Sequence, residues 1–118
     1  GWNLDDSVKL AKVLKEHQVD LVDVSSGGNI HGAKIPVSKG YQVPFSSKVK
    51  NEADVKTGAV GLITEREQAE EILKNGDADL IFVAREILRN PYLAVQGSFE
   101  ENEENFFPKQ YLRAKPQK

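Results

Sequence analysis

Apolar and polar positions recur along the chain in one order: a short apolar run, a turn rich in Gly, Ser or Thr, and then a segment with helical spacing. Three apolar runs stand out, at residues 19–24, 56–63 and 78–84. Short runs that stay apolar without alternation are typical of parallel strands, which are buried on both faces. The pattern therefore predicts an α/β fold in which parallel strands are joined by crossover helices.

Segments with helical spacing flank these runs. The first, at residues 4–17, can be capped by Asp5 or Asp6, and the second, at residues 43–53, carries Pro44 at a first helical position. The apolar face expected of the first helix consists of Val8, Leu10, Ala11, Val13 and Leu14.

The later helices are marked by their ends. Thr64 and Glu67 have the spacing of a capping box, and the Asn-Gly dipeptide at residues 75–76 is typical of a helix end. The last helical segment, residues 85–97, contains Pro91, which either interrupts the helix or restarts it.

Length and composition narrow the class of protein. The 118 residues make one domain at most, about half of the ~250 residues of a complete (β/α) barrel. Methionine is absent and glycine stands at position 1, so we expect a piece of a longer protein. A formal charge of −2 gives no electrostatic reason to expect nucleic acid, and no apolar run approaches the ~20 residues that cross a membrane. We therefore expect a cytoplasmic protein. The chain contains no cysteine, which excludes disulfides and thiolate chemistry.

Small or cationic residues stand at the end of each predicted strand, where ligands gather in parallel α/β folds. They are Ser25-Ser26 after the first strand, Gly61 in the second and Ala84-Arg85 at the end of the third. Small side chains let an anion reach backbone N–H groups, and arginine donates two hydrogen bonds to phosphate oxygens. The coincidence favours a phosphate site in which Gly61 clears space for the anion.

Structural explanations stay open for the same residues. Gly58 and Gly61 could simply relieve packing against a helix. Arg85 could form an ordinary surface ion pair with Glu86 or Asp79.

We expect neither catalytic nor metal-binding residues in this chain. No general base neighbours Ser25 or Ser26 in the manner of a catalytic triad. His31, in the loop at residues 25–42, has no second ligand at metal-binding spacing, and His17 lies at a helix end, where a cation interacts well with the dipole. The loop is too long for a simple connection and is a candidate for a functional loop or lid.

Five segments, taken in order, resemble the C-terminal portion of the Old Yellow Enzyme family: DLVDVSSGGN, GYQVPF, TGAVGLIT, ADLIFVAREILRNPY and PKQYLR. The similarity is greatest to the bacterial NADPH dehydrogenase branch of these FMN-dependent ene-reductases. The resemblance implies that residues 1–118 are a single partial barrel, about the last three β/α units of a TIM (β/α)8 barrel.

The resemblance also implies roles for individual residues. Ser25, Gly61 and Ala84-Arg85 correspond to the ends of the sixth, seventh and eighth strands and are expected to bind the cofactor. Gly61 and Ala84-Arg85 match the family's FMN phosphate site. The family usually has Gly-Arg at the last position, so Ala84 is a departure, which we expect the site to tolerate. The H-x-x-H or H-x-x-N pair of the family has no counterpart in this chain.

The tail at residues 99–118 is expected to dock on this chain or a neighbouring one, because it carries the aromatic residues Phe106, Phe107 and Tyr111. Its QYLR sequence resembles the ending of the same bacterial branch, in which an arginine reaches across a dimer interface toward the neighbouring active site. By that resemblance Arg113, with Tyr111 beside it, serves the neighbouring site, and the protein is a homo-oligomer.

For the intact parent, the resemblance implies an oxidoreductase that transfers hydride from NADPH to FMN and then to the activated C=C bond of an α,β-unsaturated carbonyl compound. We expect the isolated chain to be inactive. Two alternatives stay open: a non-catalytic α/β module that self-associates through unpaired strand edges, and a half-barrel that binds the phosphate of another ligand, such as a sugar phosphate.

Overall fold

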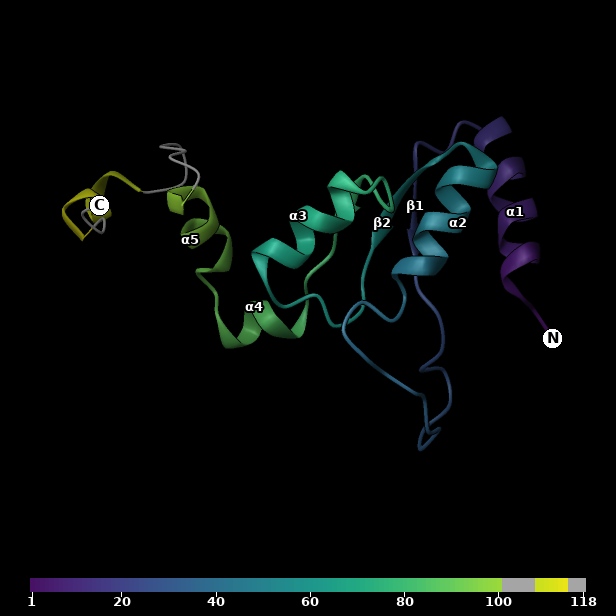
Figure 1. Ribbon diagram of the computed structural model, residues 1–118, viewed down its shortest axis with the longest axis horizontal. Coiled ribbons are helices and arrows are strands. Elements are labelled where there is room, and N and C mark those ends of the chain that lie inside the picture. Colours follow the sequence, from purple (N-terminus) through teal and green to yellow (C-terminus); the bar gives the residue numbers. More distant parts are fainter. Residues whose placement is uncertain (101–107, 115–118) are drawn as a thin grey trace. The chain divides into compact units, whose positions relative to one another are not determined.

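The computed structural model describes residues 1–100 and 108–114. Its elements are α1 (Leu4–Glu16), β1 (Leu21–Val24), α2 (Val43–Ala53), β2 (Lys56–Ala59), α3 (Arg66–Lys74), β3 (Leu80–Ile81), α4 (Arg85–Arg89), α5 (Leu93–Glu100) and the 3-10 helix η1 (Lys109–Ala114) (Figure 1). They form two compact units, Gly1–Val83 and Ala84–Lys118, whose placement relative to each other is not fixed. In the part of the chain that the structure describes, no helix combines the length and apolar character needed to cross a bilayer.

The first unit is built on a parallel sheet with the strand order β1-β2-β3. Val22 of β1 pairs with Thr57 of β2, and Gly58 of β2 pairs with Leu80 of β3. Helices α2 and α3 lie in the connections between these strands. The predicted α/β fold, with parallel strands and crossover helices, is therefore confirmed.

The strands are shorter than the apolar runs that predict them. β2 ends at Ala59, and shortly afterwards Gly61 and Leu62 adopt φ angles of 116° and 50°, which lie outside the extended region. β3 consists of Leu80–Ile81, and Leu80 is 51% exposed. The expectation that the strands are buried on both faces is therefore wrong for β3 within the described residues.

Helix α1 is capped by Asn3 and not by Asp5 or Asp6 as predicted. The Asn3 side chain accepts a hydrogen bond from the Asp6 N–H at 3.0 Å, and the Asp6 carboxylate accepts one from the Asn3 N–H at 3.1 Å. Asn3 can serve as the cap because its backbone is extended, with φ of −126°, whereas both aspartates are already helical. The reciprocal pair is a capping box.

The buried face of α1 is narrower than predicted. Val8 and Ala11 are buried, whereas Leu10 and Val13 are 44% and 48% exposed. No described residue buries these last two side chains, so the predicted apolar face is wrong at both positions. The buried pair shares a core with residues of β1, α2 and the chain entering β2: Val24, Val49, Ala53 and Val55.

Helix α3 begins differently from the prediction. Glu65 is its N-cap and makes no capping hydrogen bond, so the predicted Thr64–Glu67 capping box is wrong. The Gln68 side chain takes over this role: its Oε1 accepts the Thr64 N–H at 3.2 Å, and its Nε2 donates to the Leu62 carbonyl at 3.1 Å. The loop after β2 is thus hydrogen-bonded to a residue in the first turn of α3.

Other predicted helix signals are confirmed. Pro44 lies in the first turn of α2. Helix α3 ends with Asn75 as its C-cap and Gly76 at φ of 74°. Pro91 separates α4 from α5, so it interrupts the predicted helix.

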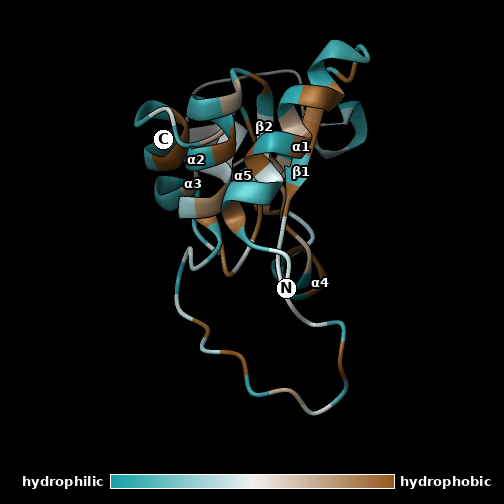
Figure 2. Ribbon diagram, turned by 90° about the vertical axis from the view of Figure 1, so that its right-hand side faces the viewer, coloured by the Kyte–Doolittle hydropathy of each residue, from teal (hydrophilic) through white to brown (hydrophobic). Residues whose placement is uncertain are grey.

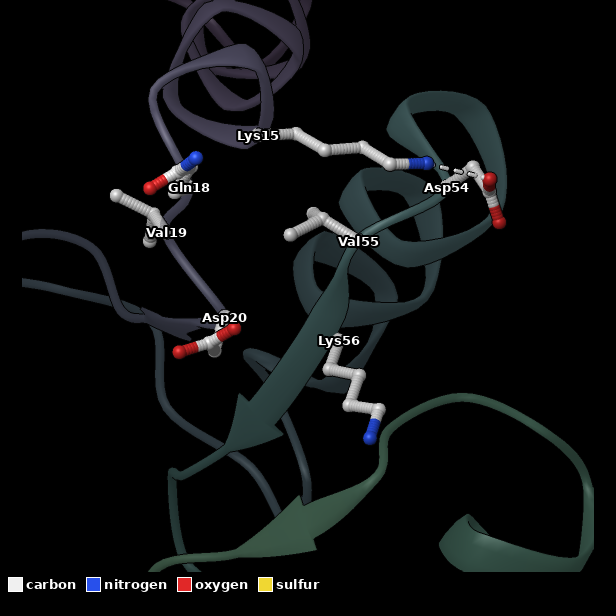
Figure 3. A pocket seen from close by; sticks show the side chains of 7 residues that line it. All are labelled: Lys15, Gln18, Val19, Asp20, Asp54, Val55 and Lys56. Atoms are coloured by element: carbon white, nitrogen blue, oxygen red, sulfur yellow. Dashed lines mark hydrogen bonds and ion pairs between the residues drawn. The ribbon is translucent and has the colours of Figure 1, made fainter.

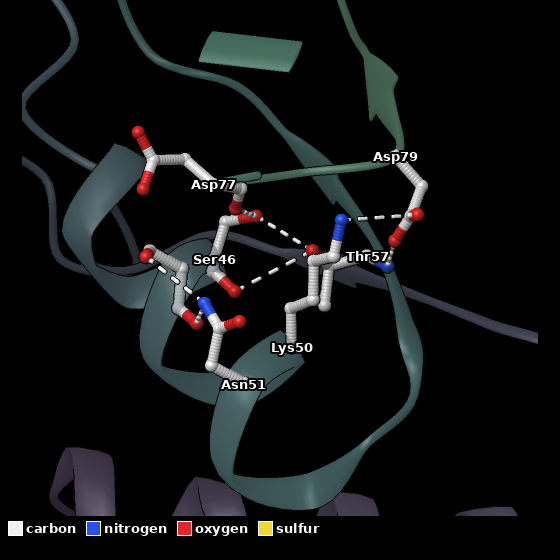
Figure 4. Close-up of polar contacts among 7 residues, drawn as sticks. Ser46, Lys50, Asn51, Thr57, Asp77 and Asp79 are labelled. Atoms are coloured by element: carbon white, nitrogen blue, oxygen red, sulfur yellow. Dashed lines mark hydrogen bonds and ion pairs between the residues drawn. The ribbon is translucent and has the colours of Figure 1, made fainter. Parts of the chain in front are cut away.

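A buried polar cluster ties α2 to β2 and to the chain entering β3 (Figure 4). Ser46 Oγ lies 2.8 Å from Thr57 Oγ1 and donates to the Asp77 carbonyl at 2.9 Å. Asp79 accepts the Thr57 N–H at 2.9 Å and pairs with Lys50 at 3.2 Å. Burial raises the pKa of Asp79, but the Thr57 N–H and Lys50 outweigh it, so the pKa lies below its ordinary value.

The predicted tail at residues 99–118 is described only in part. Phe106 and Phe107 lie outside the described residues. Tyr111 lies on η1 and is 60% exposed. The docking of the tail, and the single partial barrel across residues 1–118, stay predictions.

Candidate functional site

The carboxyl end of the sheet carries the segments that follow β1 and β2. Ser25 stands directly after β1, and Gly61 lies just beyond the end of β2. Because the two strands are parallel neighbours, both segments lie at the same edge of the sheet. After Ser25 the chain forms a loop, exposed throughout residues 25–39, that extends away from the helices and strands of this unit (Figure 2).

Gln42 links these segments, and the sequence analysis gave it no role. It is only 5% exposed. Its Oε1 accepts a hydrogen bond from the Ser26 N–H, and its Nε2 donates to the Tyr41 hydroxyl at 3.0 Å. The signal that could have found it is the segment GYQVPF, which the family resemblance marks as a block without distinguishing the glutamine.

Gly61 is held in close contact with the same short segment. A Cβ at this position would lie 3.1 Å from Tyr41 Cε1 and from Gln42 Cγ, and its φ of 116° is one that other residues rarely adopt. The Gly61 carbonyl accepts the Gly40 N–H at 3.1 Å. The Gly61 N–H has no acceptor among the described residues, although the residue is buried. Packing therefore explains the glycine, and its unpaired N–H is a donor of the kind that an anion site requires.

Gly58, the other glycine of the β2 region, is explained by packing alone. A Cβ there would lie 1.9 Å from Phe82 Cε2, which no small adjustment could relieve. The glycine therefore makes room for an aromatic ring that follows β3, and not for a helix as the sequence analysis considered.

Ala84 and Arg85 are the first residues of the second unit. Ala84 has φ and ψ of −113° and −86°, a combination outside both the helical and the extended regions. Arg85 is exposed and has no ion pair among the described residues. The two partners considered for it are engaged elsewhere: Glu86 pairs with Arg89 at 2.9 Å, and the Asp79 carboxylate binds a lysine of α2.

Tyr111 and Arg113 lie on η1, where neither is buried. The Tyr111 N–H donates to the Pro108 carbonyl at 2.8 Å, which closes the first turn. No described residue forms a salt bridge with Arg113. Their predicted role at a neighbouring site stays a prediction.

Cavities open at both ends of the first unit. One of about 500 Å³ lies beside Ser25 and is lined partly by Val24 and Phe45. Another of about 630 Å³ lies at the amino end of the strands, where Lys15 pairs with Asp54 at 2.5 Å (Figure 3). Only the first cavity lies at the end of the sheet where parallel α/β folds bind ligands.

Parallel strands joined by helices define an α/β protein, the class in which ligands bind at the carboxyl ends of the strands. Residues 2–103 match the NADH:flavin oxidoreductase / NADH oxidase family. The chain belongs to this family, as the sequence resemblance predicts.

Three bacterial relatives, each named NADPH dehydrogenase, support this membership. The NADPH dehydrogenase of Listeria monocytogenes is 51% identical over 114 residues, which are 97% of this chain and 33% of that protein. The NADPH dehydrogenase of Bacillus subtilis is 50% identical over 113 residues, 96% of this chain and 33% of that protein. The NADPH dehydrogenase of a Geobacillus species is 60% identical over 92 residues, which are 78% of this chain and 27% of that protein. The chain thus spans about a third of the length of these relatives.

Proposed function

We propose that the chain is part of an FMN-dependent oxidoreductase that oxidises NADPH and reduces the activated C=C bond of α,β-unsaturated carbonyl compounds. The family name specifies a flavin, and the relatives are named NADPH dehydrogenases. In this proposal the chain supplies about the last three β/α units of a TIM barrel, and the barrel is completed by the remaining two thirds of the protein.

The observation that carries the proposal is the N–H of the buried residue Gly61, which has no acceptor in the part of the chain that the structure describes. A buried backbone donor is almost always paired, so an anionic group at this place would complete its hydrogen bonding. The FMN phosphate is the anion that the family provides. Ser25, at the same edge of the sheet, offers an exposed hydroxyl. Arg85, which has no ion pair with any described residue, offers a guanidinium.

FMN supplies the hydride chemistry when it is bound, because a flavin accepts hydride from NADPH and passes it on. In the proposal, this chain binds and orients the phosphate end of the cofactor through Ser25, Gly61, Ala84 and Arg85. Residues of the chain beyond these 118 hold the flavin ring and the carbonyl of the enone substrate.

We further propose that Tyr111 and Arg113 act at the active site of a neighbouring subunit in a homo-oligomer. Both side chains are exposed on η1 and are free to contact another chain. Neither a nucleic acid nor a membrane is a partner in this proposal, which places the protein in the cytoplasm.

The test is to purify the intact parent protein and measure its flavin content and its NADPH oxidation with 2-cyclohexenone as substrate. The proposal predicts a yellow protein that retains one FMN per subunit and oxidises NADPH only when an acceptor is present. A protein that stays colourless after reconstitution with FMN would overturn it. Retention of a different phosphate compound would instead favour the half-barrel for another ligand.

One observation favours a second candidate, the self-associating module. In the described sheet, β1 and β3 each have one neighbouring strand, so each leaves an edge without hydrogen-bonded partners. Sedimentation of the 118-residue chain at rising concentration discriminates between the candidates. A dimer that binds no flavin even when the rest of the parent is added favours the module, and a monomer at all concentrations argues against it.

A further inference from the structure

We infer that Gln42 is a positioning residue for the cofactor site: it holds the segment after β1 and the segment after β2 at a fixed distance from each other. The inference rests on the proposed function, because the two segments carry Ser25 and Gly61, which would contact the FMN phosphate. Gln42 itself acts through its neighbours and does not need to touch the cofactor.

The geometry joins three separate parts of the first unit. The Gln42 Oε1 accepts the Ser26 N–H after β1, and its Nε2 donates to the Tyr41 hydroxyl. The Cβ and Cγ of Gln42 pack where a Gly61 side chain would otherwise lie, at 3.2 and 3.1 Å from its ideal Cβ position. The Gly40 N–H adds a hydrogen bond of 3.1 Å to the Gly61 carbonyl.

The place of Gln42 in α2 supports a role beyond helix stability. Gln42 is the N-cap of α2, yet its side chain makes no hydrogen bond to that helix. Side chains that cap their own helix are usually shorter, such as Ser, Thr, Asp and Asn. Here the carboxamide oxygen accepts the Ser26 N–H after β1 instead.

Burial of the Gln42 side chain requires both of its hydrogen bonds. A primary amide that is 5% exposed destabilises the fold unless its polar atoms are paired, and both ends of this amide are. The paired amide thus holds its side chain between the Ser26 N–H and the backbone of Gly61. Loss of the amide would release the Ser26 N–H and leave the loop after β1 without this anchor.

The experiment uses the intact parent protein and its Gln42→Leu variant, which keeps the volume of the side chain and removes both hydrogen bonds. The expected result is an FMN dissociation constant raised about tenfold or more, which corresponds to the loss of one or two positioned hydrogen bonds. Hydrogen exchange of the Ser26 amide in the apoprotein should accelerate by a similar factor of about ten. Riboflavin affinity should change much less, since it lacks the phosphate.

Ser46→Ala is the matched control. Ser46 is fully buried and hydrogen-bonded to Thr57, so its loss lowers the melting temperature, but it lies outside the proposed cofactor contacts. Its FMN dissociation constant should stay within about twofold of the wild-type value, while the Gln42→Leu value does not. Equal effects of the two variants on FMN affinity would mean that Gln42 is merely structural and would overturn the inference.

Tyr41→Phe keeps the inference testable if Gln42→Leu does not fold. This variant removes only the acceptor of the Gln42 Nε2, so we expect FMN binding to weaken by about threefold with faster exchange at Ser26. Unchanged binding and exchange in Tyr41→Phe would count against the inference. A wild-type protein that binds no FMN would overturn the proposed function instead, which separates the two failures.

Discussion

At the scale of single residues, the candidate site depends on a glycine whose backbone no other residue adopts easily. Gly61 combines a φ of 116° with side-chain neighbours 3.1 Å from its missing Cβ. Gly76 has a φ of 74°, but a Cβ added there would meet no atom within 4 Å. Comparing substitutions at Gly61 and Gly76 therefore shows how much crowding adds to backbone strain.

Gly61→Ala is expected to lower the free energy of unfolding by about 2 to 3 kcal/mol, because it adds overpacking to backbone strain. Gly76→Ala should lower it by only about 1 kcal/mol, the cost of the strain alone. Urea unfolding of both variants measures the difference. Equal losses would show that the contact with Tyr41 and Gln42 is not tight.

Asp79→Asn should change how stability depends on pH. The pKa of Asp79 is lowered in the folded state, so its carboxylate stabilises the fold above its unfolded pKa of about 3.9. That contribution is lost as the pH falls through the lower folded pKa. We expect the variant to lose about 1 to 2 kcal/mol at pH 7, a modest figure because the side chain is 30% exposed, and to converge with the wild type in strong acid.

Urea unfolding at pH 7 and at pH 2.5 or below measures this effect. Asp20→Asn is the control, because Asp20 is exposed and has no hydrogen bond or ion pair among the described residues. If Asp79→Asn and the wild type differ by the same amount at both pH values, the Asp79 interactions do not contribute as stated.

Residue types at strand ends predict the position of Ser25 and Gly61 in the fold but not that of Gln42. The first two follow apolar runs directly, so the sequence places them at the carboxyl edge of the sheet. Gln42 reaches its position by a hydrogen bond to a residue on the far side of a long loop, and no local pattern encodes such a contact.

At the scale of elements, the existence of the helices and strands was predictable and their ends were not. The spacing of apolar residues predicts α1, α2 and α3, because the buried face of a helix is encoded by many residues and not by one. A cap depends on the φ angle of a single residue, which tertiary packing decides. This is why Asn3 replaces the predicted aspartates and Gln68 replaces the predicted Thr64–Glu67 box.

The end of α1 gives an element-scale prediction. Gln18 adopts a φ of 65°, and its N–H donates to the Lys15 carbonyl at 3.0 Å, an arrangement that glycine usually provides. Gln18→Gly should therefore raise the free energy of unfolding by about 0.5 to 1 kcal/mol, and Gln18→Ala should not. Thermal unfolding of the two variants decides; equal melting temperatures would mean that the helix end carries no strain.

At the scale of the whole molecule, the sequence predicts which strands are parallel but not which faces stay uncovered. Leu10, Val13 and Leu80 belong to apolar patterns and are nevertheless 44% to 51% exposed. In the proposed function these surfaces are covered by the two thirds of the parent that this chain does not span. The apolar pattern alone cannot reveal this. It indicates which side chains are buried in the whole protein, but not which part of the sequence covers them.

The most direct measurement compares the affinities of the intact parent for FMN and for riboflavin, in the wild type and in Arg85→Ala and Arg89→Ala. Arg85, which forms no ion pair within residues 1–100 and 108–114, is proposed to bind the phosphate, whereas Arg89 pairs with Glu86. We predict that the preference for FMN over riboflavin falls at least tenfold, about 1.4 kcal/mol or more, in Arg85→Ala and is unchanged in Arg89→Ala. An unchanged preference in Arg85→Ala would contradict a phosphate site at the carboxyl ends of these strands.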